Sequence, residues 1–243
     1  MKPIPQVLHQ IWYQGESAMP DKYRRYRESW RSLHPGWSYR LWDARGLADH
    51  VASHHGWFLP IYEAFPHDVQ RMDTARYCLL KSFGGVYSDV DIECLRPIDE
   101  LFEGHELILS ATIGYNNALI GSIPGHALWE TVFRNLRDGV SAALDDLPRR
   151  ARTSAANQIA ATVGPRFFTM SVEQSGVADS PTTLKCPGYY FEPGVPVSPD
   201  QRALTGQPYG RHDMDLNWLP AYARWVSKLS RPVLGALWRV CGR

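Results

Sequence analysis

The sequence is poor in cysteine and carries no excess of charge of either sign, and each shortage excludes a class of protein. Its four cysteines stand far apart with no C-x-x-C pair, so neither a structural zinc site nor a disulfide scaffold is favoured. A reducing cytosol is the plain interpretation. The formal net charge is +1, from 26 basic and 25 acidic residues, which argues against a general nucleic-acid-binding protein.

Long hydrophobic runs are also missing. The sequence has no stretch of about 18 apolar residues that could span a bilayer, and Met1 to Gln6 lack the apolar segment of a secretory signal. We therefore expect a cytoplasmic protein, either soluble or attached peripherally to the inner face of the cytoplasmic membrane. What the chain does have is 243 residues, 44% of them hydrophobic, so it can bury a substantial core.

Strand and helix patterns alternate along the chain. Val7 to Tyr13 and Ser38 to Trp42 are rich in β-branched and aromatic residues, which is typical of strands. From Pro20 to Leu33 apolar side chains recur every three or four residues and predict an amphipathic helix. Further along we predict a strand at Glu106 to Thr112 and a helix at His126 to Arg137. We therefore expect an α/β fold.

The expected α/β domain covers residues 1–218, and a smaller extension covers 219–243. Asp138 to Arg152 reads as a polar linker region. We expect loops at Ile113 to Gly125 and at Pro187 to Tyr209, the second of which is rich in proline. The choice of substrate would lie in these loops.

Residues 71–94, RMDTARYCLLKSFGGVYSDVDIEC, are the most informative stretch. The apolar spacing predicts a helix with Asp68 as its N-cap. Gly84-Gly85 would end it, since glycine can adopt the left-handed turn at a helix C-terminus. A strand from Val86 to Ile92 is expected to follow directly.

Two aspartates occupy alternate positions of that expected strand, so Asp89 and Asp91 would face the same side. Mg²⁺ and Mn²⁺ prefer oxygen ligands and usually bind one or two carboxylates plus phosphate oxygens. The pattern is also compatible with a solvated edge strand whose acids discourage aggregation. A second Asp-x-Asp, at Asp213 and Asp215, shows how easily the motif arises. Glu93 is expected to face solvent or to contact another side chain near the site.

Other candidate residues are ambiguous when taken alone. Asp73 and Arg76 lie three positions apart on the predicted helix, so both can lie on one face. They form either a surface ion pair or a binding pair, in which Asp73 accepts a hydrogen bond from a sugar hydroxyl and Arg76 donates to a phosphate or hydroxyl group. His212 is a lone histidine that would be a ligand only if the fold brought it to Asp91. Trp12 is either core or a platform for a nucleobase, since nucleotides bind at the carboxyl ends of strands in α/β sheets.

Six segments, taken in order, point to one family. They are IPQVLHQIWYQG, SWRSLHPGWSYRLWD, RMDTARYCLLKSFGGVYSDVDIECLRPID, NNALIGSIPGH, VGPRFF and HDMDLNW. Together they resemble glycosyltransferase family 32, the DXD sugar-binding group that includes fungal α-mannosyltransferases and bacterial capsule and lipopolysaccharide enzymes. The resemblance implies a GT-A-type, Rossmann-like α/β fold and a UDP- or GDP-sugar donor with Mn²⁺ or Mg²⁺. It also implies retaining transfer of a hexose with an α-linkage, in surface polysaccharide or glycolipid synthesis.

The resemblance also implies roles for individual residues. Asp91 would bind the metal directly, and Asp89 would reach it through water or hold the ribose. Asp73 and Arg76 would grip the donor sugar and would be catalytic together with Asp91. Met72 stands where the family usually has Ser, which concerns a backbone or hydroxyl contact and not the Asp73 carboxylate. The remaining implied contacts are those of His212 with the metal and diphosphate, Trp218 beside it, Trp12 with the base, and Asn117 with the sugar or the acceptor.

Two other functions stay open on the sequence alone. A phosphohydrolase of the haloacid-dehalogenase type would use Asp89 as nucleophile and Asp91 as acid or base on Mg²⁺. That scheme normally has Thr or Val at the position of Glu93. A carbohydrate- or membrane-binding module with an inactive site would keep the fold without turnover.

Residues 219–243 contain basic residues and no acidic ones, alternating with Trp, Leu and Val. This basic amphipathic pattern suits a helix in the headgroup region of an anionic membrane, and equally a terminal helix packed on the domain. The first alternative favours a lipid-linked sugar at the cytoplasmic face. The expected partners are therefore a nucleotide-sugar, a glycan or lipid-linked acceptor and an anionic membrane surface, and no nucleic acid.

Overall fold

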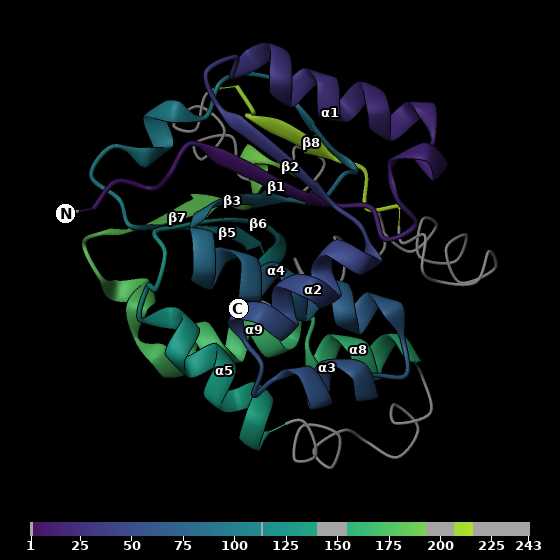
Figure 1. Ribbon diagram of the computed structural model, residues 1–243. Helices are drawn as coiled ribbons and strands as arrows, with labels where there is room; N and C mark the ends of the chain where they lie inside the picture. The colour runs from purple at the N-terminus through teal and green to yellow at the C-terminus, as the bar shows by residue number, and fades with distance from the viewer. Residues whose placement is uncertain (1, 113, 140–154, 193–206, 216–243) are drawn as a thin grey trace, which may run out of the picture.

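A six-stranded sheet in the order β2-β1-β3-β6-β5-β7 runs through the middle of the protein (Figure 1). The computed structural model describes residues 2–112, 114–139, 155–192 and 207–215. Strands β2, β1 and β3 are parallel to one another, β6 runs antiparallel to both β3 and β5, and β5 is parallel to β7. The strands are β1 (Val7–Ile11), β2 (Ser38–Trp42), β3 (Gly85–Ser88), β5 (Leu107–Thr112), β6 (Gly114–Ser122) and β7 (Thr183–Pro187).

Helices cover the two faces of the sheet unequally, as Figure 1 shows. On one face lie α1 (Asp21–Leu33) and a small two-stranded sheet made of β4 (Ile92–Cys94) and β8 (Gly210–His212). The opposite face carries α2 (Ala44–His54), α3 (Leu59–Ala64), α4 (Asp68–Phe83), α5 (Leu128–Asp138), α8 (Ala155–Thr162) and α9 (Pro165–Ser175). Short 3-10 helices connect some of these elements: η1 (Glu16–Ala18), η2 (Asp99–Phe102), η3 (Val177–Asp179) and η4 (Gly188–Tyr190).

Neighbouring residues of the central strands pack into different hydrophobic cores. Val86 lies in the core beneath α1, whereas Tyr87 lies in the core beneath the six helices. Ile108 and Leu109 of β5 divide in the same way. A strand that is buried on both faces needs hydrophobic residues at successive positions and not only at alternate ones. This explains why the central strands have apolar runs.

The predicted helices form close to their expected limits. Helix α1 buries Tyr23, Tyr26 and Trp30, and Pro20 is its N-cap residue. For α4 the predicted N-cap is wrong by one residue, because His67 occupies that position and Asp68 is the first helical residue. Three of the described α-helices, α3, α8 and α9, were not predicted.

The glycine pair after α4 allows close approach of backbone segments. Gly84 and Gly85 have φ angles of 62° and 86°, which side-chain-bearing residues rarely adopt. A Cβ atom at Gly84 would lie 2.6 Å from the backbone nitrogen of Pro124, and one at Gly85 would lie 2.5 Å from the carbonyl oxygen of Val7. The pair therefore lets β3 begin directly beside β1.

The predicted continuous strand from Val86 to Ile92 is wrong. Strand β3 ends at Ser88, a turn covers residues 89–91, and β4 begins at Ile92 in a different sheet. The turn is closed by a hydrogen bond from the Ile92 amide to the Asp89 carbonyl (3.2 Å). Because β3 lies between β1 and β6, the edge-strand alternative is also wrong.

The predicted loop from Ile113 to Gly125 is wrong as well, since most of it is β6. Its first residues, Gly114 to Asn117, lack the β-branched side chains that mark strands in a sequence. The predicted loop after Pro187 and the linker after Asp138 fall mostly outside the described residues, as do Trp218 and the extension 219–243. Among the described helices, none has the length and apolar character required to cross a membrane.

Candidate active site

The candidate site lies at the carboxyl ends of the three parallel strands β2, β1 and β3. Trp12 follows β1, Asp43 follows β2 and Asp89 follows β3. The paired register of β1 and β2 brings their ends together, and the Trp12 amide donates to the Trp42 carbonyl at 2.9 Å. In open α/β sheets this edge is where nucleotides bind.

Three potential metal ligands converge at this edge. One ligand atom from each of Asp89, Asp91 and His212 lies within 4.8 Å of the others. The two aspartates flank the turn between β3 and β4, so the turn, and not strand alternation, brings them together. His212 arrives from β8, which pairs antiparallel with β4 and places His212 opposite Ile92. Its Nε2 lies 3.3 Å from Oδ1 of Asp91, which is the convergence that the sequence argument required.

A buried carboxylate supports the other side of the His212 ring. Oε1 of Glu192 lies 3.5 Å from Nδ1 of His212 and also accepts a hydrogen bond from the Asn116 side-chain amide. Burial of the ring lowers the pKa of His212, but hydrogen bonds with Asp91 and Glu192 outweigh it and raise the pKa to about 10. For Asp91, burial is outweighed in the same way, and the contact with His212 lowers its pKa.

A second cluster, made of buried polar groups, lies directly beside these ligands. Arg76 and Asp73 are each only 5% exposed, and their side chains form an ion pair of 2.6 Å. Nη1 of Arg76 also lies 3.2 Å from Oδ1 of Asp89 and donates to the Asn117 carbonyl at 2.8 Å. The interpretation as a surface ion pair is therefore wrong, because tertiary packing encloses both groups.

Asn117 completes this second cluster. Its Nδ2 donates to Oδ1 of Asp73 (3.2 Å) and to the Tyr77 hydroxyl (3.1 Å). Burial raises the pKa of Asp73 to about 6, against the opposing effects of Arg76 and Asn117. Within the described part of the chain, the Nε of Arg76 is buried and has no hydrogen-bond partner. Such an orphaned donor is costly unless a ligand satisfies it.

The charges and donor types fit a divalent cation. Asp73, Asp89, Asp91 and Glu192 supply four carboxylates against the guanidinium of Arg76 and the protonated ring of His212, which leaves two negative charges, and three once a bound ion has displaced the His212 proton. Carboxylate oxygens suit Mg²⁺ and Mn²⁺, and imidazole nitrogen is a common ligand for transition metals. Asp89, Asp91 and His212 are therefore able to hold one such ion.

Trp12 packs against the core at the edge of the candidate site. The side chain is half-buried against Met19, Tyr23 and Val90, and its ring centroid lies 5.2 Å from that of Tyr23. Its Nε1 is buried and lacks a hydrogen-bond partner among the described residues. Trp12 thus forms part of the core at the very edge where a nucleotide would lie.

Sequence reasoning missed Glu192 and the role of the second Asp-x-Asp. Glu192 stands at the start of a proline-rich stretch without periodicity, so only its burial reveals it. Asp215, which the sequence suggested was background, donates its backbone amide to Oδ2 of Asp91 at 2.9 Å. Glu93 pairs with Arg211 at 2.7 Å, consistent with its expected supporting place beside the site.

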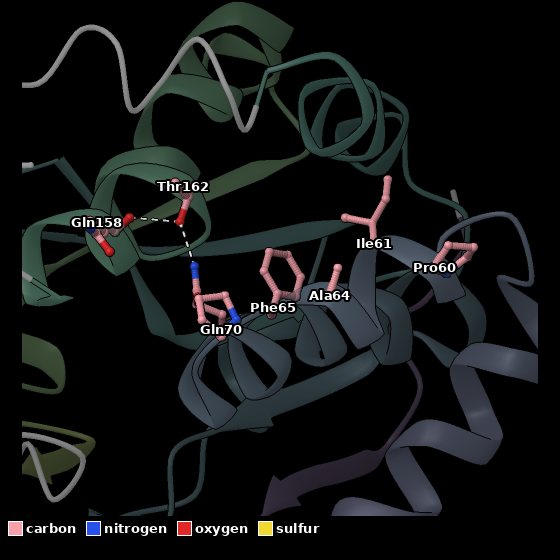
Figure 2. A pocket seen from close by; sticks show the side chains of 8 residues that line it. Pro60, Ile61, Ala64, Phe65, Gln70, Gln158 and Thr162 are labelled. Atoms are coloured by element: carbon pink, nitrogen blue, oxygen red, sulfur yellow. Dashed lines mark hydrogen bonds between the residues drawn. The ribbon is translucent and has the colours of Figure 1, made fainter.

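A separate apolar pocket of about 400 Å³ lies between α3, α4 and α8 (Figure 2). Nε2 of Gln70 donates to Oγ1 of Thr162 (3.2 Å) beside it, as the dashed line in Figure 2 shows. Gln70 precedes Asp73 by about one turn of α4, so the same helix lines the apolar pocket and supplies the buried ion pair. The lining residues are Pro60, Ile61, Ala64, Phe65, Pro66, Gln70, Gln158 and Thr162.

Comparisons with known proteins find related sequences over part of the chain. A family model described as a glycosyltransferase sugar-binding region containing a DXD motif matches residues 20–108. Inositol phosphoceramide mannosyltransferase 1 of Schizosaccharomyces pombe is 34% identical over 141 residues, which cover 56% of this chain and 44% of that protein. Mannosyl phosphorylinositol ceramide synthase SUR1 of Saccharomyces cerevisiae is 30% identical over 135 residues, covering 55% and 35%. The chain spans less than half the length of either relative.

Solved structures show the same fold. The UDP-bound glycosyltransferase domain from the YGT toxin has a TM-score of 0.58 and 8% sequence identity, with 75% of this chain and 79% of that chain covered. At so low an identity the likeness concerns the fold alone. The predicted GT-A-type α/β fold is confirmed.

Proposed function

Because the chain belongs to the glycosyltransferases whose sugar-binding region contains a DXD motif, we propose that it is a metal-dependent, retaining hexosyltransferase. Its donor would be a UDP- or GDP-sugar, and its product an α-linked glycan or glycolipid. The observation that carries the proposal is the convergence of Asp89, Asp91 and His212 beside the buried Asp73–Arg76 pair. These residues come from separate parts of the sequence and meet at the nucleotide-binding edge of the sheet.

The first cluster would bind the diphosphate end of the donor. A bound Mn²⁺ or Mg²⁺ would neutralise the charge that develops on the departing nucleoside diphosphate. Asp91 and His212 would hold the ion. Oδ1 of Asp89 accepts from the Tyr87 hydroxyl at 2.6 Å, so this carboxylate is oriented before any ligand arrives. Preorganised charges of this kind stabilise a transition state without reorganisation at the moment of reaction.

The second cluster would bind the sugar. Asp73 would accept from a sugar hydroxyl, and the orphaned Nε of Arg76 would donate to a sugar or phosphate oxygen. The Asp73 carboxylate is already bound by Arg76 and Asn117, which makes it an anchor and a poor nucleophile. This favours retention by attack of the acceptor on the face from which the diphosphate leaves, with a diphosphate oxygen taking the acceptor's proton.

The phosphohydrolase alternative has less support. A nucleophilic Asp89 should be a reactive carboxylate, whereas its charge is stabilised at Oδ1 by the Tyr87 hydroxyl and by Arg76, which lowers its nucleophilicity. The GT-A fold and the family match also favour glycosyl transfer. An inactive binding module would share the fold, so only a turnover measurement separates that alternative.

The names of the relatives favour a lipid-linked acceptor. The two fungal proteins are named for the mannosylation of inositol phosphoceramide and for mannosyl phosphorylinositol ceramide synthesis. We propose that this chain also transfers a hexose to a lipid-linked or glycan acceptor, at the inner face of the cytoplasmic membrane, with residues 219–243 contacting anionic lipid. Co-sedimentation with anionic liposomes should pellet the full chain but not a form that ends at Asn217. Equal pelleting would contradict a membrane role for the tail.

Turnover of a donor panel tests the function itself. Purified protein should release nucleoside diphosphate slowly from one UDP- or GDP-sugar when Mn²⁺ is present, and chelation should stop the release. A retained α-anomeric product, observed by NMR, would support retention. Absence of metal-dependent release from every sugar of the panel, with and without a glycolipid acceptor, would contradict the proposal.

A further inference from the structure

The apolar pocket between α3, α4 and α8 belongs to neither of the two clusters of the candidate site (Figure 2). Its volume of about 400 Å³ lies within the usual range of small-molecule sites, roughly 300–1,000 Å³. None of the described residues that line it carries a charge. Pro60, Ala64 and Pro66 line the pocket and are also exposed, so the pocket opens at the surface. A ligand from outside can therefore enter it.

Two polar side chains at this pocket, Gln70 and Thr162, are already satisfied within the protein. The Gln70 amide donates to the Thr162 hydroxyl at 3.2 Å, and its oxygen accepts from the His67 backbone amide at 3.3 Å. The Thr162 hydroxyl in turn donates to the Gln158 carbonyl at 2.8 Å. A polar ligand would have to break these bonds, whereas a hydrocarbon chain gains free energy by leaving water and disturbs none of them. The pocket therefore suits the hydrocarbon part of a ligand.

The pocket and the second cluster share one face of α4. Gln70, Asp73 and Tyr77 are spaced three and then four positions apart, so they lie on one stripe of the helix, and each is at most 5% exposed. Gln70 lies at the pocket and Asp73 in the second cluster, about 4.5 Å further along the helix axis. A molecule in the pocket would thus lie within about one helical turn of the residues proposed to bind the donor sugar.

A series of hydrogen bonds also joins the pocket to the second cluster. Thr162 lines the pocket, and the carbonyl of the next residue, Val163, accepts from the Tyr77 hydroxyl at 2.8 Å. That Tyr77 hydroxyl accepts from the Asn117 amide at 3.1 Å, and the same amide donates to Asp73 at 3.2 Å. The wall of the pocket and the carboxylate of the second cluster are therefore held in fixed positions relative to each other.

The chain just before α3 also carries an exposed apolar side chain. Trp57, three residues before Pro60, is 50% exposed, and Leu95 is the only other exposed large hydrophobic side chain in the described part of the chain. Tryptophan is enriched at the boundary between a membrane and water, because one end of its ring is apolar and the other is polar. An exposed tryptophan so close in sequence to an open apolar pocket favours a ligand that comes from a lipid layer.

We propose that this pocket binds one hydrocarbon chain of the acceptor lipid and so presents the head group of that lipid to the second cluster. The inference rests on the proposed function and deepens it, because it makes the acceptor a lipid and not a free glycan. Each buried methylene group strengthens binding about fourfold, so two more carbons in the chain should raise the affinity about 15-fold.

Isothermal titration of the full chain with n-hexyl, n-octyl and n-decyl glucoside tests the pocket. Each glucoside is kept below its micellar concentration, so that single molecules bind. The affinity should rise about 15-fold from hexyl to octyl and again from octyl to decyl. An affinity that did not depend on chain length would overturn the inference.

The variant Ala64→Trp tests where the chain binds. Ala64 is exposed on α3, so a larger side chain can fill the pocket without disturbing the core, and the affinity for decyl glucoside should fall about 10-fold or more. Ala52→Trp is the matched control, because Ala52 is exposed on α2 and does not line the pocket. It adds the same ring to the surface and should leave the affinity unchanged. Equal affinities in the two variants would overturn the assignment to this pocket.

A smaller substitution keeps this test valid if the large ring destabilises α3. Ala64→Leu adds less volume, so it should weaken the binding of decyl glucoside less than Ala64→Trp does and more than Ala52→Trp does. An affinity as high as that of the unchanged protein, in an Ala64→Leu variant with an unchanged thermal unfolding temperature, would count against the pocket.

Hydrolysis of the donor distinguishes the chain of an acceptor from that of a lipid that only anchors the protein. With the donor and Mn²⁺ present, the release of free hexose should fall as octyl glucoside saturates the protein, because its head group takes the place of water at the second cluster. Unchanged release despite tight binding of the glucoside would overturn the acceptor assignment. Absence of hexose release before any glucoside is added would contradict the proposed function, while the dependence of affinity on chain length would still show a hydrocarbon site.

Discussion

The two Asp-x-Asp motifs of this chain have the same spacing and opposite surroundings. Asp89 and Asp91 converge with His212 in a cluster that carries an excess of negative charge. Asp213 and Asp215 face Nζ of Lys22 on α1, at 2.7 and 2.5 Å. Lys22 thus serves the two carboxylates of the second motif, whereas Arg76, beside the first motif, is shared between Asp89 and Asp73 and leaves negative charge to bind an ion from solution.

The comparison also shows that the second motif supports the first. The Tyr26 hydroxyl donates to Oδ2 of Asp213 at 2.8 Å, and Lys22 forms an ion pair with the same oxygen. These two contacts anchor the segment that follows β8. His212 stands immediately before this anchored segment, and Asp215 donates to Asp91 from within it. The spacing of the two aspartates therefore does not distinguish a metal-binding motif from a motif that supports it. The partners of each carboxylate make that distinction.

The largest expected effect is that of removing one charge from the first motif. Asp91→Asn should lower metal-dependent donor turnover by about 10²- to 10³-fold, because it removes a ligand for the ion that stabilises the leaving diphosphate. Asp213→Asn is the matched control and should lose far less of its donor turnover, since Asp213 lies in an ion pair with Lys22 and does not bind the metal. Release of nucleoside diphosphate measures both variants. Equal losses in the two would contradict the distinction between the motifs.

Removing Arg76, the cation shared by Asp73 and Asp89, should have an effect of similar size, this time on stability. Arg76→Met leaves the buried Asp73 and the partly buried Asp89 without their shared cation, and breaking a buried pair such as Asp73–Arg76 costs about 3–5 kcal/mol in the free energy of unfolding. Urea denaturation measures the change. Lys22→Met, whose pair is partly exposed, should cost much less. A loss below about 1 kcal/mol for Arg76→Met would mean that water reaches the two carboxylates.

A smaller effect should follow from the carboxylate behind the histidine. Glu192→Gln removes the charge that orients the His212 ring, and such changes typically weaken metal binding about 10- to 100-fold. Mn²⁺ titration measures the affinity. Glu93→Gln is the control, because Glu93 pairs with Arg211 and should leave the affinity nearly unchanged. Indistinguishable affinities for the two variants would show that Glu192 only fills space.

The smallest effect concerns histidines away from both motifs. Burial lowers the pKa of His9 and of His50 to about 4, from 6.5 in the unfolded chain. The unfolded state therefore binds more protons below pH 6.5, and stability present above that pH is lost progressively between pH 6.5 and 4. Each histidine should lower the free energy of unfolding by about 1 kcal/mol as the pH falls from 7.5 to 6. His50→Phe should flatten the pH dependence of the urea midpoint, and an unchanged slope would contradict the assignment.

Local patterns predicted the elements that local chemistry dictates. The apolar period of α1 and the glycine pair after α4 were readable because they depend on neighbours in sequence. The break between β3 and β4 was not, because Val86 to Ile92 alternates like a strand and only pairing with β8 takes Ile92 into another sheet. Asp73 and Arg76 were identified, but their burial depends on β6, whose opening residues carry no strand signal. Glu192 had no signal at all, since it acts through a contact with a residue 20 positions away.

The most direct test of the central claim is Mn²⁺ binding to the full chain with saturating UDP or GDP, measured by the loss of the electron paramagnetic resonance signal of the free ion. We expect one tightly bound Mn²⁺ per chain, retained in Asp213→Asn and lost in Asp91→Asn. Binding that survives in Asp91→Asn, or that disappears equally in Asp213→Asn, would contradict the assignment of the metal to the turn between β3 and β4.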